Sequence, residues 1–264
     1  MNLFKPEGIT VAMITPMHEN EDINEKMLRE LVNRNIEAGL QGIFCLSTNG
    51  EFFTLTREEK IRIMEIVVEE AAGRIPVWAG TGAITTKETI ALTQKAEEIG
   101  VDVVSVITPY FLTPTQDELY EHYKKVAQSA NIPVVLYNLP GRTGNSIKPE
   151  TSAKLSNIDN IVGIKDSSGD YKNTLDYIEK TGDDFAVLSG DDGLVLWTLL
   201  AGGDGGVCGT ANIYPEKLVS IYNLWKIGKI EEAKIIQESL TTLREIFGLS
   251  SFPGIVKALM KLKG

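Results

Sequence analysis

The chain has 264 residues, of which 43% are hydrophobic and 23% are charged, and its formal net charge is −10. This ordinary globular composition excludes a disordered chain, and the scattered basic residues argue against a surface for nucleic acid or anionic membrane. No apolar run approaches the roughly 20 residues that span a bilayer, and the start, MNLFKPEGIT, lacks the features of a secretory signal. We therefore expect a folded cytoplasmic protein without nucleic-acid or membrane partners.

Short apolar segments alternate with longer amphipathic segments along the chain. The helical periodicity is clear over residues 24–38 and from Thr56 to about residue 72. The expected strands are bounded by Gly, Pro, Asn or Asp and span residues 9–15, 42–47, 75–80, 101–107, 132–138, 161–166, 185–190 and 205–209.

Capping signals indicate where helices begin. Thr56 and Thr85 are each followed three residues later by glutamate, the pattern of a capping box that satisfies free backbone N–H groups. Beyond the eighth strand, a helix is expected to open near Pro215, and two more are expected over residues 230–247 and 255–262.

Eight strands, each with a helical segment after it, predict a parallel sheet covered by helices. Eight such units favour an α/β fold of the closed (β/α)8 TIM-barrel type over an open doubly wound sheet, and the chain length suits that barrel. No stretch has the composition of a linker. We expect a barrel catalytic domain over residues 1–225 and a C-terminal helical region over residues 226–264 packed on it.

Polar side chains at the carboxyl ends of the expected strands are the candidates for a site, because such barrels carry their active sites there. They include one lysine, several hydroxyls and at least two tyrosines, but no histidine and no carboxylates with metal-ligand spacing. Cys45 and Cys208 each lie inside an apolar run, where we expect buried small side chains. The inventory argues against zinc chemistry and against glycoside hydrolysis, which needs two opposed carboxylates. We expect no metal and no cofactor.

Lys165 is the most informative of these side chains, because it follows the apolar residues IVGI at the end of the sixth strand. Burial among apolar groups disfavours the charged form of an amine and leaves a neutral nucleophile that can form a Schiff base with a ketone. Tyr137, at the end of the neighbouring fifth strand, is the candidate for moving the proton. From residue types alone, a lysine that reaches water beside a core tyrosine remains the alternative.

Sequence motifs extend these observations over nearly the whole chain. They are STNGEFFTLT (47–56), ITPYF (107–111), YNLPGRTG (137–144), GIKDSSGD (163–170), LSGDDG (188–193) and GGDGGVCGTAN (202–212). Together and in this order they resemble the dihydrodipicolinate synthase and N-acetylneuraminate lyase family. The resemblance implies an eightfold barrel with a helical C-terminal region, a homotetramer or homodimer, and metal-free class I aldol chemistry between an aldehyde and pyruvate or another 2-oxo acid.

The resemblance also implies roles for individual residues. Lys165 would form the imine, and Tyr137 would shuttle the proton. Thr48, with the backbone around Asn49, would bind the carboxylate of the 2-oxo acid. Arg142 would stand at the site entrance, where the synthase branch binds the carboxylate of aspartate semialdehyde.

Three further positions would line the substrate pocket, and two positions depart from the synthase pattern. Tyr110 would contact the substrate, while Gly190 and Val207 would shape the pocket wall. Asn49 replaces the second of two successive threonines. Phe111 replaces the tyrosine that extends the proton relay into a neighbouring subunit, and phenylalanine has no hydroxyl.

These features do not decide which substrate the enzyme uses. Asn49 and Phe111 favour reversible cleavage of a 2-keto-3-deoxy sugar acid or a similar compound, which is the preferred interpretation. Arg142 favours the alternative, a 4-hydroxy-tetrahydrodipicolinate synthase that condenses pyruvate with aspartate semialdehyde. A catalytically weak metabolite-binding barrel is a third hypothesis, and the presence of both Lys165 and Tyr137 argues against it.

Overall fold

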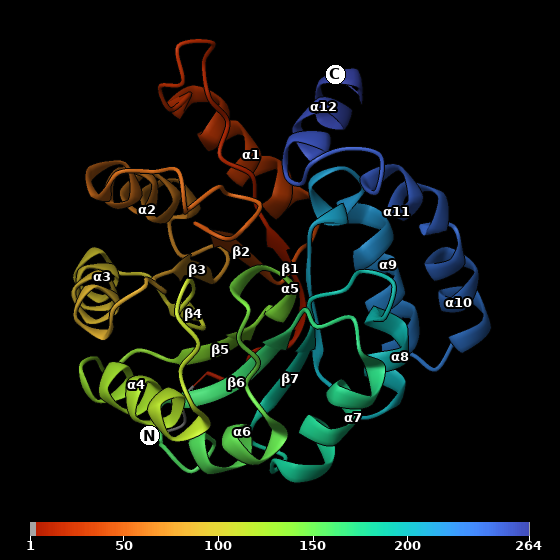
Figure 1. The fold of residues 1–264 in the computed structure, drawn as a ribbon. Helices are drawn as coiled ribbons and strands as arrows, with labels where there is room; N and C mark the ends of the chain where they lie inside the picture. The colour runs from red at the N-terminus through yellow and green to blue at the C-terminus, as the bar shows by residue number, and fades with distance from the viewer. Residues whose placement is uncertain (1–3, 264) are drawn as a thin grey trace. The chain divides into compact units, whose positions relative to one another are not determined.

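The computed structural model describes residues 4–263, in which strands alternate with helices (Figure 1). The strands are β1 (Gly8–Ala12), β2 (Gly42–Cys45), β3 (Val77–Gly80), β4 (Val103–Ile107), β5 (Val134–Asn138), β6 (Ile161–Asp166), β7 (Ala186–Ser189) and β8 (Gly205–Cys208). The helices up to β8 are α1 (Glu25–Glu37), α2 (Arg57–Ala71), α3 (Thr86–Ile99), α4 (Gln116–Gln128), α5 (Pro140–Thr143), α6 (Pro149–Leu155), α7 (Tyr171–Lys180) and α8 (Val195–Leu200). After β8 follow a 3₁₀ turn (Thr210–Asn212), α9 (Pro215–Lys226), α10 (Ile230–Glu238), α11 (Thr241–Phe247) and α12 (Gly254–Lys263).

The eight strands of the described chain form a closed barrel in sequence order. The ladders within β1–β3 and within β4–β8 are parallel. Almost every strand residue is buried, as expected where helices cover one face and the barrel interior covers the other. The predicted (β/α)8 barrel with helices after its last strand is confirmed.

Helix starts follow the predicted capping pattern. At α2, Thr56 accepts a hydrogen bond from the Glu59 N–H, and the Glu59 carboxylate accepts one from the Thr56 N–H. At α3, the Thr85 hydroxyl accepts from the Glu88 N–H. These bonds satisfy N–H groups that no preceding helical turn reaches, and they fix where the two helices begin.

The prediction of one helix over residues 230–247 is wrong, because α10 ends at Glu238 and α11 starts at Thr241. At the break, the Ser239 hydroxyl donates to the Ile236 carbonyl at 2.7 Å. A serine side chain that bonds to the backbone of its own turn competes with the helical ladder and bends the helix. Hydrophobic periodicity continues across such a break and does not reveal it.

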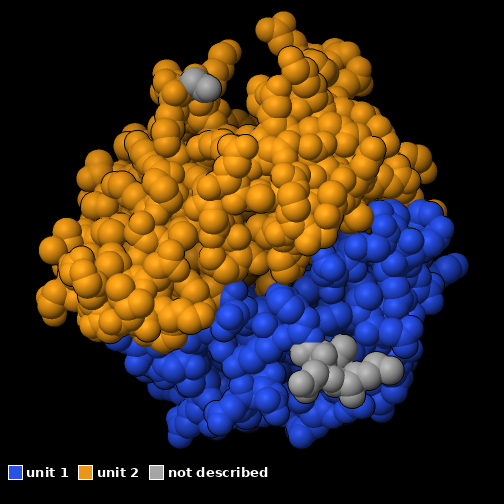
Figure 2. Space-filling view, turned by 180° about the vertical axis from the view of Figure 1, so that it is seen from behind, with its two compact units in different colours: residues 1–7, 80–206 blue, residues 8–79, 207–264 orange. Residues whose placement is uncertain are grey.

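The chain separates into two compact units, shown in different colours in Figure 2. The first unit comprises Gly80–Gly206 with the N-terminal residues up to Glu7, and it holds β4–β7 and α3–α8. The second unit comprises Gly8–Ala79 with the chain from Val207 onward, and it holds β1, β2, α1, α2 and α9–α12. The division at residue 225 between a barrel domain and a helical region stays a prediction.

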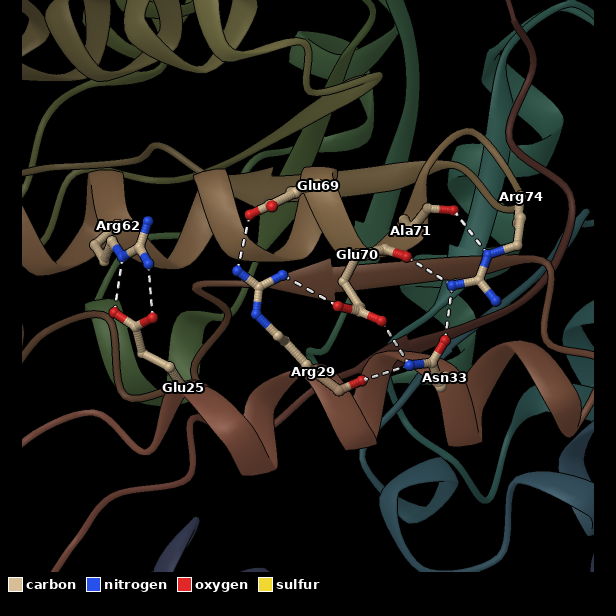
Figure 3. Close-up of polar contacts among 8 residues, drawn as sticks. All are labelled: Glu25, Arg29, Asn33, Arg62, Glu69, Glu70, Ala71 and Arg74. Carbon is tan, nitrogen blue, oxygen red and sulfur yellow. Dashed lines mark hydrogen bonds and ion pairs between the residues drawn. The ribbon is translucent and has the colours of Figure 1, made fainter.

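A network of ion pairs joins α1 to α2 within the second unit (Figure 3). Arg62 donates to both carboxylate oxygens of Glu25 at 2.7 and 2.6 Å. Arg29 pairs with Glu69 at 2.8 Å and with Glu70 at 3.0 Å. The side chains are partly exposed, so water screens each pair and its contribution to stability is small. We interpret the network as a link between two neighbouring helices.

Cys45 and Cys208 are both buried, and neither forms a disulfide within residues 4–263, which confirms the prediction of buried small side chains. Burial raises the pKa of the Cys45 thiol to about 12, so this thiol stays protonated at neutral pH and is a poor nucleophile. Across residues 4–263, no helix combines the length and the apolar character that a membrane crossing needs.

His122 is a buried histidine on α4 that makes the fold sensitive to acid. It is 5% exposed, its Nδ1 lies 2.9 Å from the Thr86 hydroxyl, and its Nε2 has no hydrogen-bond partner within residues 4–263. Burial lowers the pKa of His122 from 6.5 to about 4. Between these two values the unfolded chain binds a proton that the folded chain does not, so stability is full above pH 6.5 and falls as the pH drops toward 4.

We expect His122 to reduce the free energy of unfolding by about 3 kcal/mol across this window, from the conversion of a pKa difference into free energy. Urea unfolding of the wild type and of His122→Gln between pH 4 and pH 7 measures the effect, because the remaining titratable groups are common to both proteins. The free energy of unfolding of the variant should fall less between pH 7 and pH 4 than that of the wild type. Parallel profiles would contradict a histidine that is neutral in the folded state.

Candidate active site

Lys165 is the penultimate residue of β6, and its side chain is buried. All six residues of the strand are buried, and Lys165 itself is only 3% exposed. The alternative of a lysine that reaches water from the strand end is therefore wrong. The Lys165 Nζ lies 4.0 Å from the centroid of the Tyr137 ring. A buried lysine amine beside a tyrosine is a candidate nucleophile.

Tyr137 reaches the same place from the neighbouring strand β5. In the parallel ladder Tyr137 is in register with Lys165, and Asn138 is in register with Asp166. Residues in register on adjacent strands point to the same face of the sheet, so the phenol and the amine are brought together. Tyr137 is 4% exposed. The pair that the sequence suggests is a pair of neighbours in the fold.

Asp166, directly after Lys165, anchors the end of β6. It is 3% exposed. Its carboxylate accepts hydrogen bonds at 2.9 to 3.2 Å from Asn138 Nδ2, the Ser168 N–H and hydroxyl, Asn173 Nδ2 and the Thr174 hydroxyl. These donors belong to the end of β5, to the turn after β6 and to α7. The carboxylate therefore fixes the strand end that carries Lys165 with respect to its neighbours.

Gly190, predicted to shape the pocket wall, packs on the turn that follows Lys165. The Gly190 N–H donates to the Asp166 carbonyl at 2.7 Å. A Cβ at position 190 would lie 1.9 Å from the Ser167 hydroxyl oxygen and 3.0 Å from the Asp166 carbonyl oxygen. Only glycine allows this approach. Gly190 thus supports the end of β6, and its contact with a substrate stays a prediction.

Arg142 lies on α5, a single turn that begins at Pro140 and is followed by Gly144 in the left-handed conformation, with φ +74°. The Arg142 side chain is exposed. None of the ion pairs formed within residues 4–263 involves this guanidinium. A guanidinium presented in this way can bind an external carboxylate through two parallel hydrogen bonds.

The loop after β4 carries Tyr110 and Phe111. Burial, and then the nearby Glu88 carboxylate, raise the pKa of Tyr110. Phe111 has φ +76° and is 91% exposed. Asn145 holds the loop by donating to two of its carbonyls at 2.7 Å each. The sequence reasoning missed Asn145, and its only signal was a polar residue directly after the motif that ends at residue 144.

In the second unit, residues 46–51 form the loop after β2 that contains Thr48 and Asn49. The Asn49 Nδ2 donates to the Ala12 carbonyl at 3.0 Å, and the side chain is 3% exposed. Its Oδ1 has no hydrogen-bond partner within residues 4–263. The Asn49 amide thus anchors the loop to β1. The half-buried Thr48 and the backbone N–H groups remain the candidates in this loop for binding an anion.

Val207 lies on β8 and is 1% exposed. The chain that follows it packs closely on the loop after β2, because a Cβ at position 209 would lie 2.9 Å from Asn49 Nδ2 and 3.3 Å from Phe252 Cζ. Within residues 4–263, no three His, Cys, Asp or Glu side chains gather in a way that could hold a metal ion. The predicted residues thus fall into two sets. The first unit holds Lys165, Tyr137, Gly190, Tyr110 and Arg142, and the second unit holds Thr48, Asn49 and Val207.

Comparison with known proteins shows strong similarity to one family. The family model described as "Dihydrodipicolinate synthetase family" matches residues 5–264. A protein of Methanopyrus kandleri is 41% identical over 263 residues, which cover 99% of this chain and 88% of that protein. A protein of Thermodesulfovibrio yellowstonii is 41% identical over 258 residues, which cover 98% of this chain and 88% of that protein. Both are named 4-hydroxy-tetrahydrodipicolinate synthase.

Solved structures give the same result. The 4-hydroxy-tetrahydrodipicolinate synthase of Methylacidiphilum fumariolicum SolV matches with a TM-score of 0.96 and 36% identity, over 98% of this chain and 87% of that chain. YagE from E. coli K12, described as a prophage protein of the dihydrodipicolinic acid synthase family in complex with pyruvate, matches with a TM-score of 0.95 and 30% identity, over 98% of this chain and 88% of that chain.

Proposed function

The chain belongs to the dihydrodipicolinate synthetase family, and from this membership we propose that it is a class I aldolase whose nucleophile is Lys165. The family makes it a carbon–carbon lyase that acts on small molecules. The observation that carries the choice of nucleophile is the burial of the Lys165 amine against the Tyr137 ring. Pyruvate is the proposed 2-oxo acid, and the pyruvate complex of YagE supports this choice.

In the proposed reaction, the Lys165 Nζ attacks the C2 carbonyl of pyruvate, and loss of one water gives a protonated imine. The imine withdraws electrons from C3, which loses a proton to form the enamine. The enamine carbon then bonds to the aldehyde carbon, and the aldehyde oxygen gains a proton. One water hydrolyses the imine and restores the amine. We propose that Tyr137 carries protons between the reacting atoms, because it is the neighbouring residue on β5.

The carboxylate of the 2-oxo acid is proposed to bind the Thr48 hydroxyl and the backbone around Asn49. The anchoring of the Asn49 amide to the Ala12 carbonyl supports this assignment, because it holds the loop backbone in one conformation. A fixed set of donors loses little entropy when an anion binds. Gly190 and Val207 are proposed as parts of the pocket wall, and Tyr110 as a further contact.

For the second substrate we propose an aldehyde that carries a carboxylate, with aspartate semialdehyde as the best candidate. The names of the curated relatives support the synthase reaction. The exposed Arg142, which makes no ion pair within residues 4–263, supports an anionic partner. We therefore prefer the synthase reaction to the cleavage of a 2-keto-3-deoxy sugar acid, which the sequence alone favoured.

Cleavage of a 2-keto-3-deoxy sugar acid remains the second candidate, because of one observation. Phe111 stands where the synthase pattern has a tyrosine hydroxyl, and its ring is 91% exposed. A reaction that needs no relay through this position would tolerate phenylalanine there. Comparing kcat/KM for condensation with aspartate semialdehyde and for cleavage of a 2-keto-3-deoxy sugar acid separates the two candidates.

Arg142→Ala tests the proposed aldehyde site. We expect the KM for aspartate semialdehyde to rise about 10- to 100-fold, which corresponds to the free energy of a charge-assisted hydrogen bond. The KM for pyruvate should stay within about twofold, because Arg142 is not among the residues proposed to bind pyruvate. Steady-state kinetics with each substrate varied in turn measure both values. Equal increases in the two KM values would contradict the assignment.

We propose further that the protein is a cytoplasmic homotetramer or homodimer. Phe111 and Leu112 are 91% and 66% exposed on a loop that Asn145 holds in place, which supports contact with a second copy. One similar solved structure is described as a monomeric dihydrodipicolinate synthase variant, so relatives differ in assembly. Sedimentation equilibrium distinguishes monomer, dimer and tetramer.

A further inference from the structure

The loop that we propose binds the keto-acid carboxylate is strained at both ends. Leu46, where the chain leaves β2, has φ +56°, and Glu51 has φ +57°. Both are left-handed conformations that residues other than glycine rarely adopt, and each is unfavourable by itself. Such conformations persist only where surrounding contacts hold them. The contacts around residues 46–51 therefore decide the shape of the loop.

Contacts close to the loop account for part of this restraint. The Ser47 hydroxyl accepts from the Gly50 N–H at 3.3 Å. The Gly50 carbonyl accepts from the Thr15 hydroxyl at 2.8 Å. Asn49 is bound to the Ala12 carbonyl at 3.0 Å. The Glu51 N–H donates to the Thr48 carbonyl at 3.2 Å, and the Thr54 N–H and hydroxyl donate to the Glu51 carbonyl at 2.9 Å each. These bonds hold the backbone of the loop, but none of them restrains the Glu51 side chain.

The C-terminal helix α12 restrains the Glu51 side chain. The Lys257 ammonium forms an ion pair with the Glu51 carboxylate, and the two side chains are 28% and 21% exposed. Apart from this pair, the buried Glu51 Oε2 has no hydrogen-bond partner within residues 4–263. The segment just before α12 lies close to the same loop, because the Phe252 ring and the Asn49 amide both lie against Gly209.

A partly buried carboxylate that depends on one cation is costly to leave unpaired. Removing the cation leaves a charged group in a poorly solvated position, and the loop can then relieve its strain by moving Glu51 toward water. Such a movement would shift the backbone near Thr48, three residues earlier in the same loop. Exposed pairs elsewhere on the surface lack this dependence, because water solvates both partners.

We infer that Lys257 is a positioning residue: through Glu51 it sets the geometry of the loop that binds the keto-acid carboxylate. This inference rests on the proposed function and assigns a role in substrate binding to α12. Lys257 does not touch the reacting atoms in this account, and its effect falls on affinity for the 2-oxo acid. Loss of such uniform binding raises KM and leaves kcat nearly unchanged.

The test measures the pyruvate concentration that half-saturates formation of the borohydride-trapped imine. For Lys257→Met, this concentration should rise about tenfold or more, while the maximal amount of adduct stays within about twofold of the wild type. Lys257→Arg keeps the charge and should restore binding to near the wild-type value. If α12 had only a structural role, Lys257→Met would lower the stability of the protein. It would not raise the half-saturating pyruvate concentration while leaving the maximal amount of adduct unchanged.

Glu51→Gln provides a second, independent variant that keeps side-chain volume. It should raise the half-saturating pyruvate concentration to a similar degree. The double variant with Lys257→Met should then be no worse than either single variant, because both remove one interaction. Additive effects would overturn the inference. If Lys257→Met fails to fold, Glu51→Gln and Lys257→Arg carry the same test.

Lys229→Met is the matched control, since it breaks the exposed pair of Lys229 with Glu232 at 2.8 Å at the start of α10. It should leave pyruvate binding unchanged. Wild-type protein that forms no adduct would refute the proposed function and the inference with it. Wild-type protein that forms the adduct, together with unchanged half-saturation in Lys257→Met and Glu51→Gln, would refute the inference alone.

Discussion

Lys165→Met is expected to abolish turnover while the protein stays folded. Loss of the amine removes the only group proposed to form a covalent bond to the substrate, so kcat should fall on the order of 10⁴-fold or more. Methionine keeps an unbranched apolar chain in the place of the lysine stem, and Lys165 is only 3% exposed. The variant therefore leaves no large cavity beside the Tyr137 ring. Steady-state kinetics and urea unfolding measure the two properties.

The matched control is Lys172→Met on α7, which breaks an exposed ion pair with Asp176. Its activity should equal that of the wild type, and its free energy of unfolding should change little, because water solvates both partners of the pair. Residual activity of the Lys165 variant above a few per cent of the wild type would contradict the imine mechanism. A variant that is inactive but also unfolded is replaced in the same assay by Lys165→Arg, which keeps a long side chain whose guanidinium is not a usable nucleophile.

Asp166→Ala is expected to lower the free energy of unfolding by about 3–5 kcal/mol, because it leaves several buried donors without an acceptor. The Asp166 carboxylate accepts from Asn138, Ser168, Asn173 and Thr174. Burial, and then the charge of Asp166, raise the pKa of Tyr177. Urea unfolding at pH 7, followed by circular dichroism, gives the difference between the two proteins.

Asp176→Asn serves as the control for this prediction, since Asp176 pairs with Lys172 at the surface. The free energy of unfolding of this variant should stay close to that of the wild type, because water solvates the Lys172 partner. Asp166→Asn keeps one acceptor oxygen. Its free energy of unfolding should lie between those of Asp166→Ala and Asp176→Asn. An Asp166→Ala protein as stable as the control would show that these hydrogen bonds do not hold the end of β6.

The fold was predictable because its signals are local. The predicted strand IVGIKD has the same limits as β6, and the threonines before α2 and α3 mark where those helices start. The predicted first strand, residues 9–15, extends past β1, which ends at Ala12. Met13 and Ile14 are apolar because they are buried beyond the ladder, at 1% and 5% exposure. An apolar run reports burial and not strand pairing.

The site was predictable only where a motif carried its chemistry. Lys165 was singled out because it follows the apolar residues IVGI, and Tyr137 because it ends the neighbouring strand; both lie in motifs that resemble those of the family. Asn145 and Lys257 could not be found in this way, since each acts through a contact with a segment distant in sequence. One asparagine in a loop and one lysine on a helix look like surface residues. Their roles arise from tertiary packing, which no local pattern encodes.

Borohydride reduction in the presence of pyruvate, followed by intact mass and peptide mapping, tests the central claim most directly. The account predicts one pyruvate adduct per chain, on Lys165, and no adduct in Lys165→Met. It would be contradicted if the folded wild type gave no adduct with pyruvate or with other 2-oxo acids. That result would favour a barrel that binds metabolites without this chemistry.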